Sequence, residues 1–406
     1  MMMWVLLIVL IGIAAGVSSA VFLILLEMVT DFRVANSWVI WLLPVTGLLI
    51  GLAYHRWGKD IVKGNNLVID EYYNPQKKIP LKMMPMILIS TLLTHLFGAS
   101  VGREGTAVQM SCSIADQFTG VFKLNNENRK IILILGISAG FSAIFGTPLT
   151  AAIFSVEILV IGKLGLRAFL PSILVAYVAD YICHLCQAKH TIYSIPFIPP
   201  ISLKAVLFAL IAGIIFGLVA LLYKKAARFF EDMFKEKVAY PPLRPMIGGL
   251  FIAIAASLFP LANYLGLGIP TISDSFITQQ PLEAFVIKII LTTYALGAGF
   301  KGGEVTPLFF IGATLGNALF LFTPNGTLPM ALLAGMGFVA VFAGATNTPI
   351  ACTVMGMELF GIECGIFVGI ACLMAYFFSG KSCVYHSQPQ KGLKYLIYNH
   401  WHKTPT

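Results

Sequence analysis

The sequence HLFGASVGREGTAVQM, residues 95–110, places an arginine and a glutamate side by side within an otherwise apolar stretch. An ionisable side chain at membrane depth is costly, so a functional role is the first hypothesis for Arg103 and Glu104. Flanking glycines leave the backbone bare, and residues 106–110 can begin a helix. A glycine-rich turn before a helix aims free N–H groups at an anion. The stretch is a candidate anion site that contains a carboxylate; a structural Arg–Glu pair and a surface loop are the alternatives.

The composition places this stretch in an integral membrane protein. Of 406 residues, 58% are hydrophobic and 11% are charged, with a mean hydropathy of +0.86, whereas soluble proteins average about 25% charged residues. Long uncharged runs lack the alternation of a β-barrel, so the spans are expected to be helices. With roughly 20 apolar residues per span, the sequence predicts about ten or more, in the runs 3–29, 38–54, 83–99, 130–160, 166–187, 203–223, 246–265, 283–300, 305–322, 328–345 and 349–379.

Two features of the chain allow other interpretations. The run 3–29 has no basic segment before it and is too long for a signal peptide, so we interpret it as the first span. The net charge of +9 is also typical of nucleic-acid binding, but the basic residues sit in short loops, where they set membrane orientation. We therefore expect a lipid bilayer around the protein and no nucleic-acid partner.

An internal repeat divides the chain into halves. Three regions recur 201 residues on: Gly12, Ile13 and Gly16 as Gly213, Ile214 and Gly217; Pro44 and Gly47 as Pro245 and Gly248; Gly136, Thr147, Pro148 and Glu157 as Gly337, Thr348, Pro349 and Glu358. A fourth recurs 200 residues on: Gly102, Glu104 and Thr106 as Gly302, Glu304 and Thr306. A nearly constant offset in four regions predicts repeats at 1–199 and 200–390, followed by a short tail at 391–406.

Basic residues predict that the two halves are inverted in the membrane. Loop 30–37 holds one basic residue and its repeat 224–244 holds six, whereas loop 55–82 holds six and the matching 257–282 holds none. Because positive loops face the cytoplasm, 55–82, 224–244 and both termini are expected there. Inverted repeats place a binding site near the midplane, where broken helices point at the substrate. Helix N-termini suit an anion, and the corresponding breaks lie at 98–107 and 297–307.

A third break, G-N-N-L-V-I at 64–69, follows the basic loop on the cytoplasmic side. The side chain of Asn65 offers two N–H donors without a charge, which suits the mouth of an anion path. The alternative is a helix cap, for which asparagine is equally suited. Both roles stay open at this point.

The cysteines form one recognisable motif. Cys183 and Cys186 make a C-x-x-C with His184 between them and His190 after them. A metal or redox site is one interpretation, but we favour small apolar residues at a helix end and expect no metal or cofactor. His400 and His402 are interpreted as part of a solvated tail.

The three glycine-rich loops resemble signature loops of the CLC family of anion channels and proton-coupled anion exchangers, and the resemblance runs along nearly the whole chain. That family carries G-S-G-I-P, G-R-E-G-P and G-x-F-x-P loops and a tyrosine near the last helix. Here 102–106 has Thr106 for proline, 303–307 has Val305 at the usual Phe, and 64–68 has Asn65 at the usual Ser and no proline. Tyr385, in SGKSCVYHSQ, aligns with the tyrosine after a one-residue shift. The CBS domains of some relatives have no counterpart in this sequence.

The departures resemble one branch of the family, the fluoride/proton antiporters, which has G-R-E-G-T, a G-G-E-x-T-P loop, and Asn or Met in place of the Ser. Chloride/proton exchangers carry a second, inward-facing proton glutamate, and the matching position here is Ile158, one past Glu157. That proton route is missing, and Glu304 is the replacement that we expect. Fluoride also fits physically, because a small, strongly hydrated anion requires close, strong donors.

The resemblance implies a polytopic α-helical fold and a homodimer with one pathway per subunit, and it assigns roles to specific residues. We expect Glu104 to alternate: ionised, it occupies the anion site like a tethered substrate; protonated, it leaves and the anion takes its place. Glu304 is the second coupling carboxylate. It either interacts electrostatically with the bound anion or passes the proton inward, unless it merely caps its helix. The implied anion-binding residues are Gly64, Asn65, Gly102, Arg103, Gly105, Thr106, Gly303, Val305, Thr306 and Tyr385.

The function predicted from these residues is fluoride export in exchange for protons across a bacterial plasma membrane. A chloride/proton exchanger of the same fold is the nearest alternative, and a passive anion channel is the next, since channels of the family often keep the glutamate. A membrane enzyme would need a nucleophile–base pair or a metal cluster, and we find neither in the sequence, so we do not expect an enzyme.

Overall fold

The computed structural model describes residues 2–159, 166–390, 394–396 and 398, and the regular structure in these residues is helical apart from one isolated bridge. The α-helices of the first half are α1 (Met2–Ala35), α2 (Leu43–Trp57), α3 (Asn65–Tyr73), α4 (Met83–Leu96), α5 (Glu104–Val121), α6 (Asn126–Phe145), α7 (Pro148–Glu157) and α8 (Leu166–Leu185). Those of the second half are α9 (Leu203–Lys237), α10 (Leu243–Leu258), α11 (Ile269–Asp274), α12 (Ala284–Ala298), α13 (Val305–Phe320), α14 (Met330–Thr346), α15 (Pro349–Phe360) and α16 (Gly365–Phe378).

The helices of the two halves follow one another in the same order, α1 with α9 through to α8 with α16. The offset at the broken loops differs from the sequence pattern, however. Helix α5 begins at Glu104 and α13 begins at Val305, 201 residues later. The structural counterpart of Glu304 is therefore Arg103, because each of them is the residue just before its helix. The sequence pattern that pairs Glu304 with Glu104 at an offset of 200 residues therefore matches identical residue types that do not occupy equivalent positions in the two halves.

The apolar runs predicted as single spans are in part pairs of short helices. Among the described residues, five helical segments are long and apolar enough to cross a membrane alone, and eight apolar helices have only 10–17 residues. The run 130–160, for example, is divided into α6 and α7. Gly146 ends α6 in the left-handed conformation, with φ +69°, and Pro148 begins the next helix without an N–H to satisfy. Such breaks place helix ends inside the protein.

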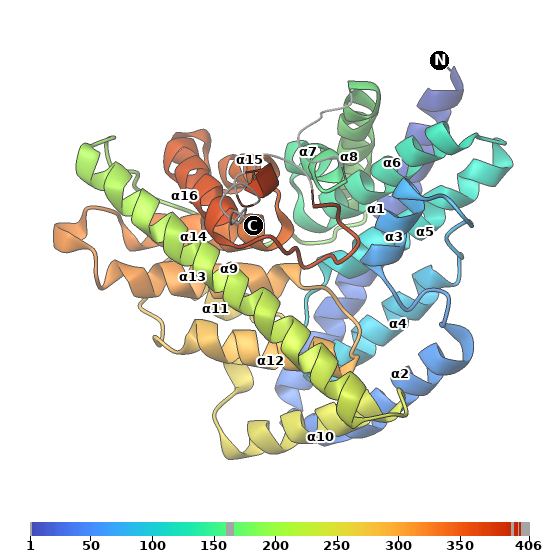
Figure 1. Cartoon of the computed structure of the whole chain (residues 1–406), viewed down its shortest axis with the longest axis horizontal. Helices are drawn as coiled ribbons and strands as arrows, with labels where there is room; N and C mark the ends of the chain where they lie inside the picture. Colours follow the sequence, from blue (N-terminus) through green and yellow to red (C-terminus); the bar gives the residue numbers. More distant parts are fainter. Residues whose placement is uncertain (1, 160–165, 391–393, 397, 399–406) are drawn as a thin grey trace, which may run out of the picture.

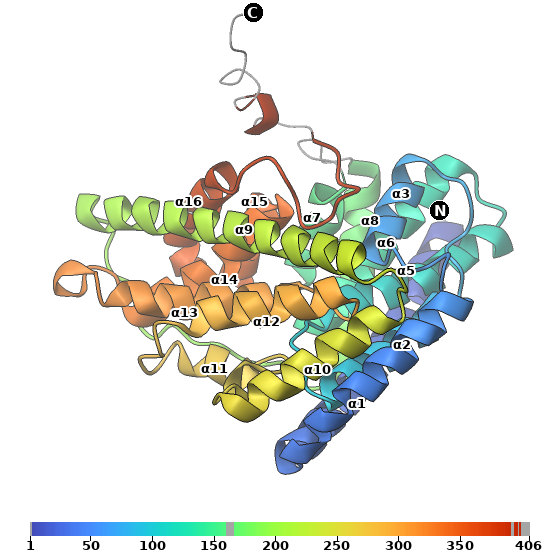
Figure 2. The ribbon, with the colours of Figure 1, turned by 60° about the horizontal axis from the view of Figure 1, so that its bottom comes forward.

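The halves lie side by side and contact each other along several seams. Figure 1 shows the first half, from blue to green, on the right, and the second half, from yellow to red, on the left. Helices α2 and α10 pack together, and α9 lies along α12 (Figure 2). The backbone of Gly47 on α2 approaches Pro245 on α10 so closely that a Cβ would lie 2.3 Å from its carbonyl oxygen. Small residues at such seams let helices pack closely without a hydrophobic driving force.

A reciprocal pair of carboxylates joins the two halves at α7 and α15. Glu157, at the end of α7, accepts the N–H groups of Ile350 and Ala351 at 3.1 and 2.8 Å. Its repeat counterpart Glu358, on α15, accepts those of Leu149 and Thr150 at 2.9 and 2.7 Å. Each half thus supplies the carboxylate that satisfies the free N–H groups at the start of the other half's helix. This exchange is what two-fold-related repeats produce.

The tail predicted at 391–406 lies mostly outside the described residues, including His400 and His402. Its described part is only partly solvated, since Leu396 is exposed whereas Lys394 and Tyr395 are buried. Lys394 is fully buried, and its Nζ donates to Asn347 Oδ1 at 2.8 Å and to Ser379 Oγ at 2.9 Å. The chain after α16 is therefore fixed against the second half, and this segment carries Tyr385 back toward α3 (Figure 1).

Candidate anion and proton site

Two of the broken loops meet backbone to backbone. Gly102 and Gly303 form an antiparallel bridge, in which each donates its N–H to the other's carbonyl at 2.5 and 2.7 Å. A Cβ on Gly303 would lie 2.7 Å from the nitrogen of Gly105, so glycine is required for this approach. The contact brings the N-termini of α5 and α13, from opposite halves, to one place, and both termini offer free N–H groups there.

The carboxylate of Glu104 lies on the N-terminus of the opposite helix. Its Oε2 accepts the N–H of Thr306 at 3.0 Å, and its Oε1 accepts the Thr306 hydroxyl at 2.5 Å. The side chain is 1% exposed. These donors belong to a helix N-terminus of the kind that binds free anions, so a side-chain anion from one half occupies an anion position of the other.

Arg103 donates its backbone N–H to Glu104 Oε2 at 3.2 Å, whereas its side chain contributes charge beside this carboxylate without a hydrogen bond to it. Its Nε is 3.5 Å from Glu104 Oε1, and the side chain is 12% exposed. It borders a small cavity of about 20 Å³, together with Glu104, Thr306 and His190. The structural Arg–Glu pair that the sequence left open therefore describes only part of the geometry, since the strong donors to Glu104 come from Thr306.

Glu304 stands just before α13 and differs from Glu104 in its bonding. Its side chain accepts no capping bond from its own helix. Its Oε2 is buried and has no hydrogen-bond partner among the described residues. The carboxylate borders a cavity of about 740 Å³ that we call the basic vestibule. No side-chain capping hydrogen bond therefore supports the alternative that Glu304 caps its own helix.

Asn65 begins α3 and faces the same loops. Gly64, before it, has φ +57°, a conformation that suits glycine. Asn65 Nδ2 lies 2.9 Å from where a Cβ on Gly105 would stand, so the amide lies against the bare backbone at the start of α5. Its Oδ1 is buried without a partner among the described residues, and it makes no capping bond. The cap alternative for Asn65 therefore finds no bond to support it either.

Tyr385 reaches the site through the segment that follows α16. Ser387 N donates to Asn66 Oδ1 at 3.0 Å, which ties this segment to α3, and the Tyr385 side chain is 6% exposed. A cavity of about 30 Å³ is bordered by Asn65, Glu104, Val305, Tyr385 and Ile158. The described structure thus brings together the residues that the sequence drew from four separate regions.

Thr106 does not share the role of Thr306. Its hydroxyl pairs with the hydroxyl of Thr91 on α4 at 2.8 Å, and the Thr106 side chain is fully buried in the first half. Thr306, by contrast, bonds Glu104. The 201-residue offset explains the difference, because the residue equivalent to Thr106 is Pro307 and not Thr306.

The basic vestibule contains residues that the sequence analysis did not select. It joins the two basic loops at one opening, and its lining holds seven basic side chains against the two carboxylates Glu231 and Glu304: Lys59, Lys63, Lys224, Arg228, Lys235, Arg244 and Lys301. Lys63 lies 2.7 Å from Asp70, whose carboxylate raises the pKa of this lysine. An excess of positive charge in a concave opening concentrates anions.

Lys301 and Tyr223 are the most notable of these missed residues. Lys301 directly precedes the loop that forms the bridge, and its Nζ lies 4.2 Å from the centre of the Tyr54 ring. The Tyr223 hydroxyl is buried without a partner among the described residues. The rule that selected Glu104, an ionisable residue in an apolar run, would also have selected Lys301. No sequence signal marked Tyr223, because a tyrosine within α9 is ordinary there.

The three cavities follow one another through shared residues. Asn65 and Tyr385 border both the basic vestibule and the 30 Å³ cavity. Glu104 borders both the 30 Å³ cavity and the 20 Å³ cavity on the Arg103 side. The Glu104 carboxylate therefore lies between the 20 Å³ cavity and the 30 Å³ cavity, and the latter adjoins the basic vestibule through Asn65 and Tyr385.

Comparisons with known proteins identify the family. The model of the voltage-gated chloride channel family matches residues 46–380, so the chain belongs to the CLC family of membrane transport proteins, which is not a class of enzymes. A chloride/fluoride channel protein of Pseudomonas syringae pv. tomato is 49% identical over 393 residues, covering 95% of this chain and 86% of that protein.

Solved structures give the same fold. A CLC-type fluoride/proton antiporter superposes with a TM-score of 0.90 at 34% identity, covering 94% of this chain and 96% of that one. A slow cyanobacterial Cl⁻/H⁺ antiporter superposes with a TM-score of 0.83 at 19% identity, covering 99% of both chains. The predicted fold class, a polytopic helical CLC fold, is confirmed.

Proposed function

We propose that this protein exports fluoride in exchange for protons, with Glu104 as the coupling group. The observation that carries the proposal is the position of the Glu104 carboxylate on the Thr306 N–H and hydroxyl, where a free anion would bind. The names of a 49% identical relative and of a 34% identical structure, which mention fluoride, support the choice of anion.

The coupling follows from competition for the same donors. While Glu104 is ionised, it holds the Thr306 donors and closes the path to a second anion. Protonation removes the charge that these donors favour, since hydrogen bonds to charged acceptors are roughly twice as strong as neutral ones. A fluoride ion then takes the donors and displaces the neutral side chain. Return of Glu104 requires that its proton leave and that the anion depart, so the two fluxes are linked.

Glu304 supplies the second carboxylate in this proposal. An ionised carboxylate beside an anion path repels the anion, and two charges close together in a low dielectric cannot both persist cheaply. We assign it either the role of a neutral acid that donates to fluoride or the role of a relay that passes the proton to the vestibule. Its unpartnered buried oxygen supports both roles.

The residue at 158 supports a proton path different from that of chloride/proton exchangers. Ile158 cannot carry a proton, and the adjacent Glu157 is bonded to the N-terminus of α15. In this proposal the anion is bound by Asn65, Tyr385, and the N-termini formed by Gly102, Arg103, Gly105, Gly303, Val305 and Thr306. Gly64 supplies the turn that positions Asn65.

The decisive experiment measures coupled fluxes in liposomes that contain the purified protein. Vesicles loaded with fluoride, with the voltage clamped by valinomycin and potassium, should take up protons as fluoride leaves, and an imposed proton gradient should drive fluoride uphill. Protein-free vesicles control for the permeation of HF. A passive channel, suggested by the name of the 49% identical relative, would pass fluoride with no proton movement, and a chloride exchanger would show the same coupling with chloride.

We also propose the arrangement of the chain in the membrane. Both termini and loops 55–82 and 224–244 face the cytoplasm, the repeats comprise 1–199 and 200–390, and 391–406 forms a cytoplasmic tail in a homodimer. In a background without reactive cysteines, Lys77→Cys and Lys225→Cys should resist an impermeant thiol reagent added to intact cells, whereas Lys189→Cys should react. Labelling of Lys77→Cys from outside would contradict the inverted arrangement.

A further inference from the structure

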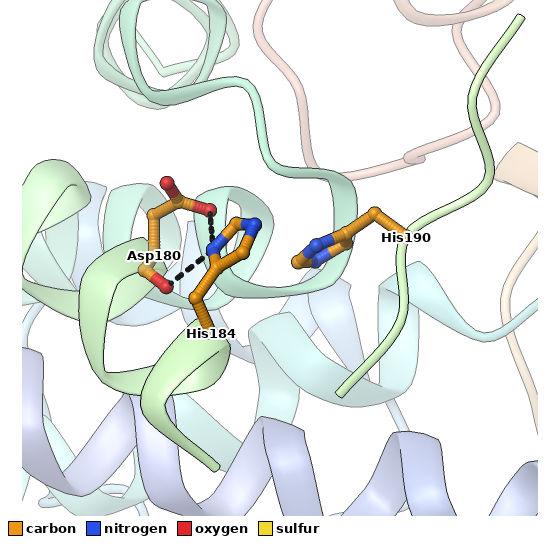
Figure 3. A group of neighbouring side chains, drawn as sticks. All are labelled: Asp180, His184 and His190. Atoms are coloured by element: carbon orange, nitrogen blue, oxygen red, sulfur yellow. Dashed lines mark hydrogen bonds and ion pairs between the residues drawn. The ribbon is translucent and has the colours of Figure 1, made fainter. Parts of the chain in front are cut away.

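Three side chains at the end of α8 form a cluster that takes no part in the proposed transport mechanism. Asp180 and His184 lie one turn apart on α8, and His190 follows on the extended segment (Figure 3). One ligand atom from each lies within 4.8 Å of the others. The two imidazole rings lie next to each other, with their centres 4.9 Å apart and their planes tilted. This is a set of nitrogen and oxygen donors of the kind that binds zinc.

The hydrogen bonding of His190 fixes which of its nitrogens is free. Nε2 lies 3.0 Å from the carbonyl oxygen of Ala143. A carbonyl only accepts, so Nε2 must carry the hydrogen, and the lone pair is on Nδ1. Nδ1 is buried and has no hydrogen-bond partner among the described residues. A ring held by a backbone carbonyl through one nitrogen, with the other nitrogen free, is the usual arrangement of a metal-binding histidine.

Asp180 presents an oxygen to the same space. Its Oδ1 is buried without a hydrogen-bond partner among the described residues, and it lies 3.3 Å from His184 Nδ1. Gly146 at the end of α6 leaves room beside the cluster, since a Cβ there would lie 3.4 Å from His190 Nδ1 and 3.7 Å from Asp180 Oδ1. A simple ion pair between His184 and Asp180 would leave His190 Nδ1 buried and unpaired.

His184 supplies the mobile ligand. Its Nδ1 lies 3.0 Å from the backbone carbonyl oxygen of Asp180 (Figure 3), so Nδ1 carries the hydrogen and the lone pair is on Nε2. The side chain is 57% exposed, so the ring can rotate to present Nε2 without disturbing the core. Bonds from zinc to nitrogen and oxygen of about 2.0–2.2 Å place ligand atoms about 4 Å apart or closer, and a small rotation of this ring closes the cluster to that size. Three protein ligands leave a fourth position open to water.

The C-x-x-C motif is not part of this cluster. Cys183 is buried and Cys186 is half-buried, both as free thiols, and neither belongs to the group of donors found within the described part of the chain. The sequence motif named His184 and His190 together with the two cysteines, whereas the group of converging donors consists of these two histidines and Asp180. Because side chains four apart on a helix share a face, Asp180 and His184 are the residues that converge.

The position of the cluster relates it to the transport path. His190 borders the 20 Å³ cavity that also contains Arg103 and Glu104. This cavity lies on the side of Glu104 away from the basic vestibule, which is the side that the proposed orientation places outside the cell. A divalent cation bound there would add positive charge next to Arg103 and hold the segment that carries His190 against α6 and α8.

We propose that Asp180, His184 and His190 form a binding site for a divalent transition metal of the zinc type, and that an occupied site slows anion passage past Glu104. Imidazole and carboxylate ligands favour Zn²⁺ and its neighbours over Ca²⁺ or Mg²⁺. The binding half of the proposal does not depend on the transport function, whereas the slowing of flux rests on it.

The binding test uses tag-free purified protein titrated with zinc chloride in a calorimeter. We expect one Zn²⁺ per chain, at least about tenfold weaker binding in His190→Ala and in His184→Ala, and a thermal stabilisation by zinc that the variants lack. His55→Ala, a histidine in the vestibule, and Cys186→Ser should bind as the unchanged protein does. Equal binding by His190→Ala, or loss of binding in Cys186→Ser, would overturn the site.

The flux test adds zinc chloride to liposomes during fluoride efflux, with EDTA as the reversal. Efflux should slow in the unchanged protein and in His55→Ala relative to each one's own metal-free rate, and should stay unchanged in His190→Ala. Binding without any slowing would overturn the regulatory half and leave the site. A chain that binds zinc but conducts no fluoride at all would count against the proposed function and not against the site.

Discussion

Two pairs of glutamates stand at the interface between the halves, and they are bonded in opposite ways. Glu157 and Glu358 occupy equivalent positions, and each accepts two backbone N–H groups from the other half's helix. Glu104 and Glu304 do not occupy equivalent positions. Glu104 takes the donors of α13, whereas a buried oxygen of Glu304 has none among the described residues.

This difference in bonding distinguishes a pair of glutamates that stabilises the fold from a pair that we assign to transport. A reciprocal pair satisfies both helix ends at once, and neither partner can leave without exposing N–H groups, so it stabilises one arrangement. An asymmetric pair leaves one carboxylate holding donors that an anion can also use, and another carboxylate with a buried oxygen that has no hydrogen-bond partner among the described residues. Such an arrangement has an alternative occupant and a group ready to exchange a proton. The four residues are therefore expected to respond differently to the same substitution.

The largest effect is expected for Glu104→Gln. Glutamine keeps the shape but cannot ionise, so it behaves as a permanently protonated side chain. The rate of fluoride-coupled proton transport in liposomes should fall by at least about 100-fold, which is the rate enhancement that a positioned proton-transfer group usually contributes. Anion flux should either continue uncoupled or stop, depending on whether the neutral side chain still blocks the path.

The matched control for this variant is Glu283→Gln, which changes an exposed glutamate before α12. It should transport at the normal rate. Proton pumping against fluoride by Glu104→Gln at a normal rate would show that the competition for the Thr306 donors is not the coupling step.

A smaller effect is expected for Glu304→Gln. The amide keeps the size and a donor, but removes titration from the carboxylate that borders the vestibule. Fluoride turnover should slow by about tenfold, corresponding to roughly 1.4 kcal/mol, which lies near the worth of one charged hydrogen bond. Thermal unfolding of the purified variant should remain normal. Full coupled exchange in a stable Glu304→Gln protein would leave this residue with no part in transport.

The reciprocal pair should show the reverse pattern. In Glu157→Gln the amide NH₂ faces backbone N–H groups, so one bond is lost at the start of α15, and the free energy of unfolding should fall by about 1–3 kcal/mol. Coupled transport by the folded protein should persist. Glu127→Gln, on a carboxylate 79% exposed, is the control and should change neither quantity. Loss of proton coupling in a folded Glu157→Gln protein would reinstate the proton route that Ile158 interrupts in the sequence.

Much of the fold could be predicted because its signals are local or periodic. Apolar runs gave the helical regions, and the recurrence of Pro148 as Pro349 and of Glu157 as Glu358 gave the correspondence of the halves. The run 130–160 was wrongly joined, since hydropathy alone does not register the turn at Gly146 and the helix start at Pro148. Those breaks depend on a left-handed backbone and a missing N–H, not on polarity.

The site was predictable in its members but not in its bonds. The glycine-rich motifs indicated Glu104, Asn65 and Glu304, the family resemblance implied Tyr385, and the structure gathers these residues. The pairing of Thr106 with Thr306 in the sequence was misleading, because the two residues stand one position apart relative to the starts of their helices. Their hydroxyls therefore bond different groups, Thr91 and Glu104. Lys301 and His190 were not assigned to the path, because their contributions depend on cavities formed by helices distant in sequence.

The smallest effect is expected for Tyr385→Phe, which removes one hydroxyl from the cavity shared with Asn65 and Glu104. The ring keeps its packing, and Asn65 with the helix ends still supplies donors, so one neutral hydrogen bond of about 0.5–1.5 kcal/mol is lost at most. Fluoride affinity, measured from the concentration dependence of efflux, should weaken by about threefold, with the ratio of protons to fluoride unchanged. Tyr240→Phe, at an exposed ring that contacts His55 edge to face, is the control and should leave affinity unchanged. A Tyr385→Phe protein that loses proton coupling would place this hydroxyl on the proton path, and the asymmetry between Glu104 and Glu304 would then no longer account for coupling alone.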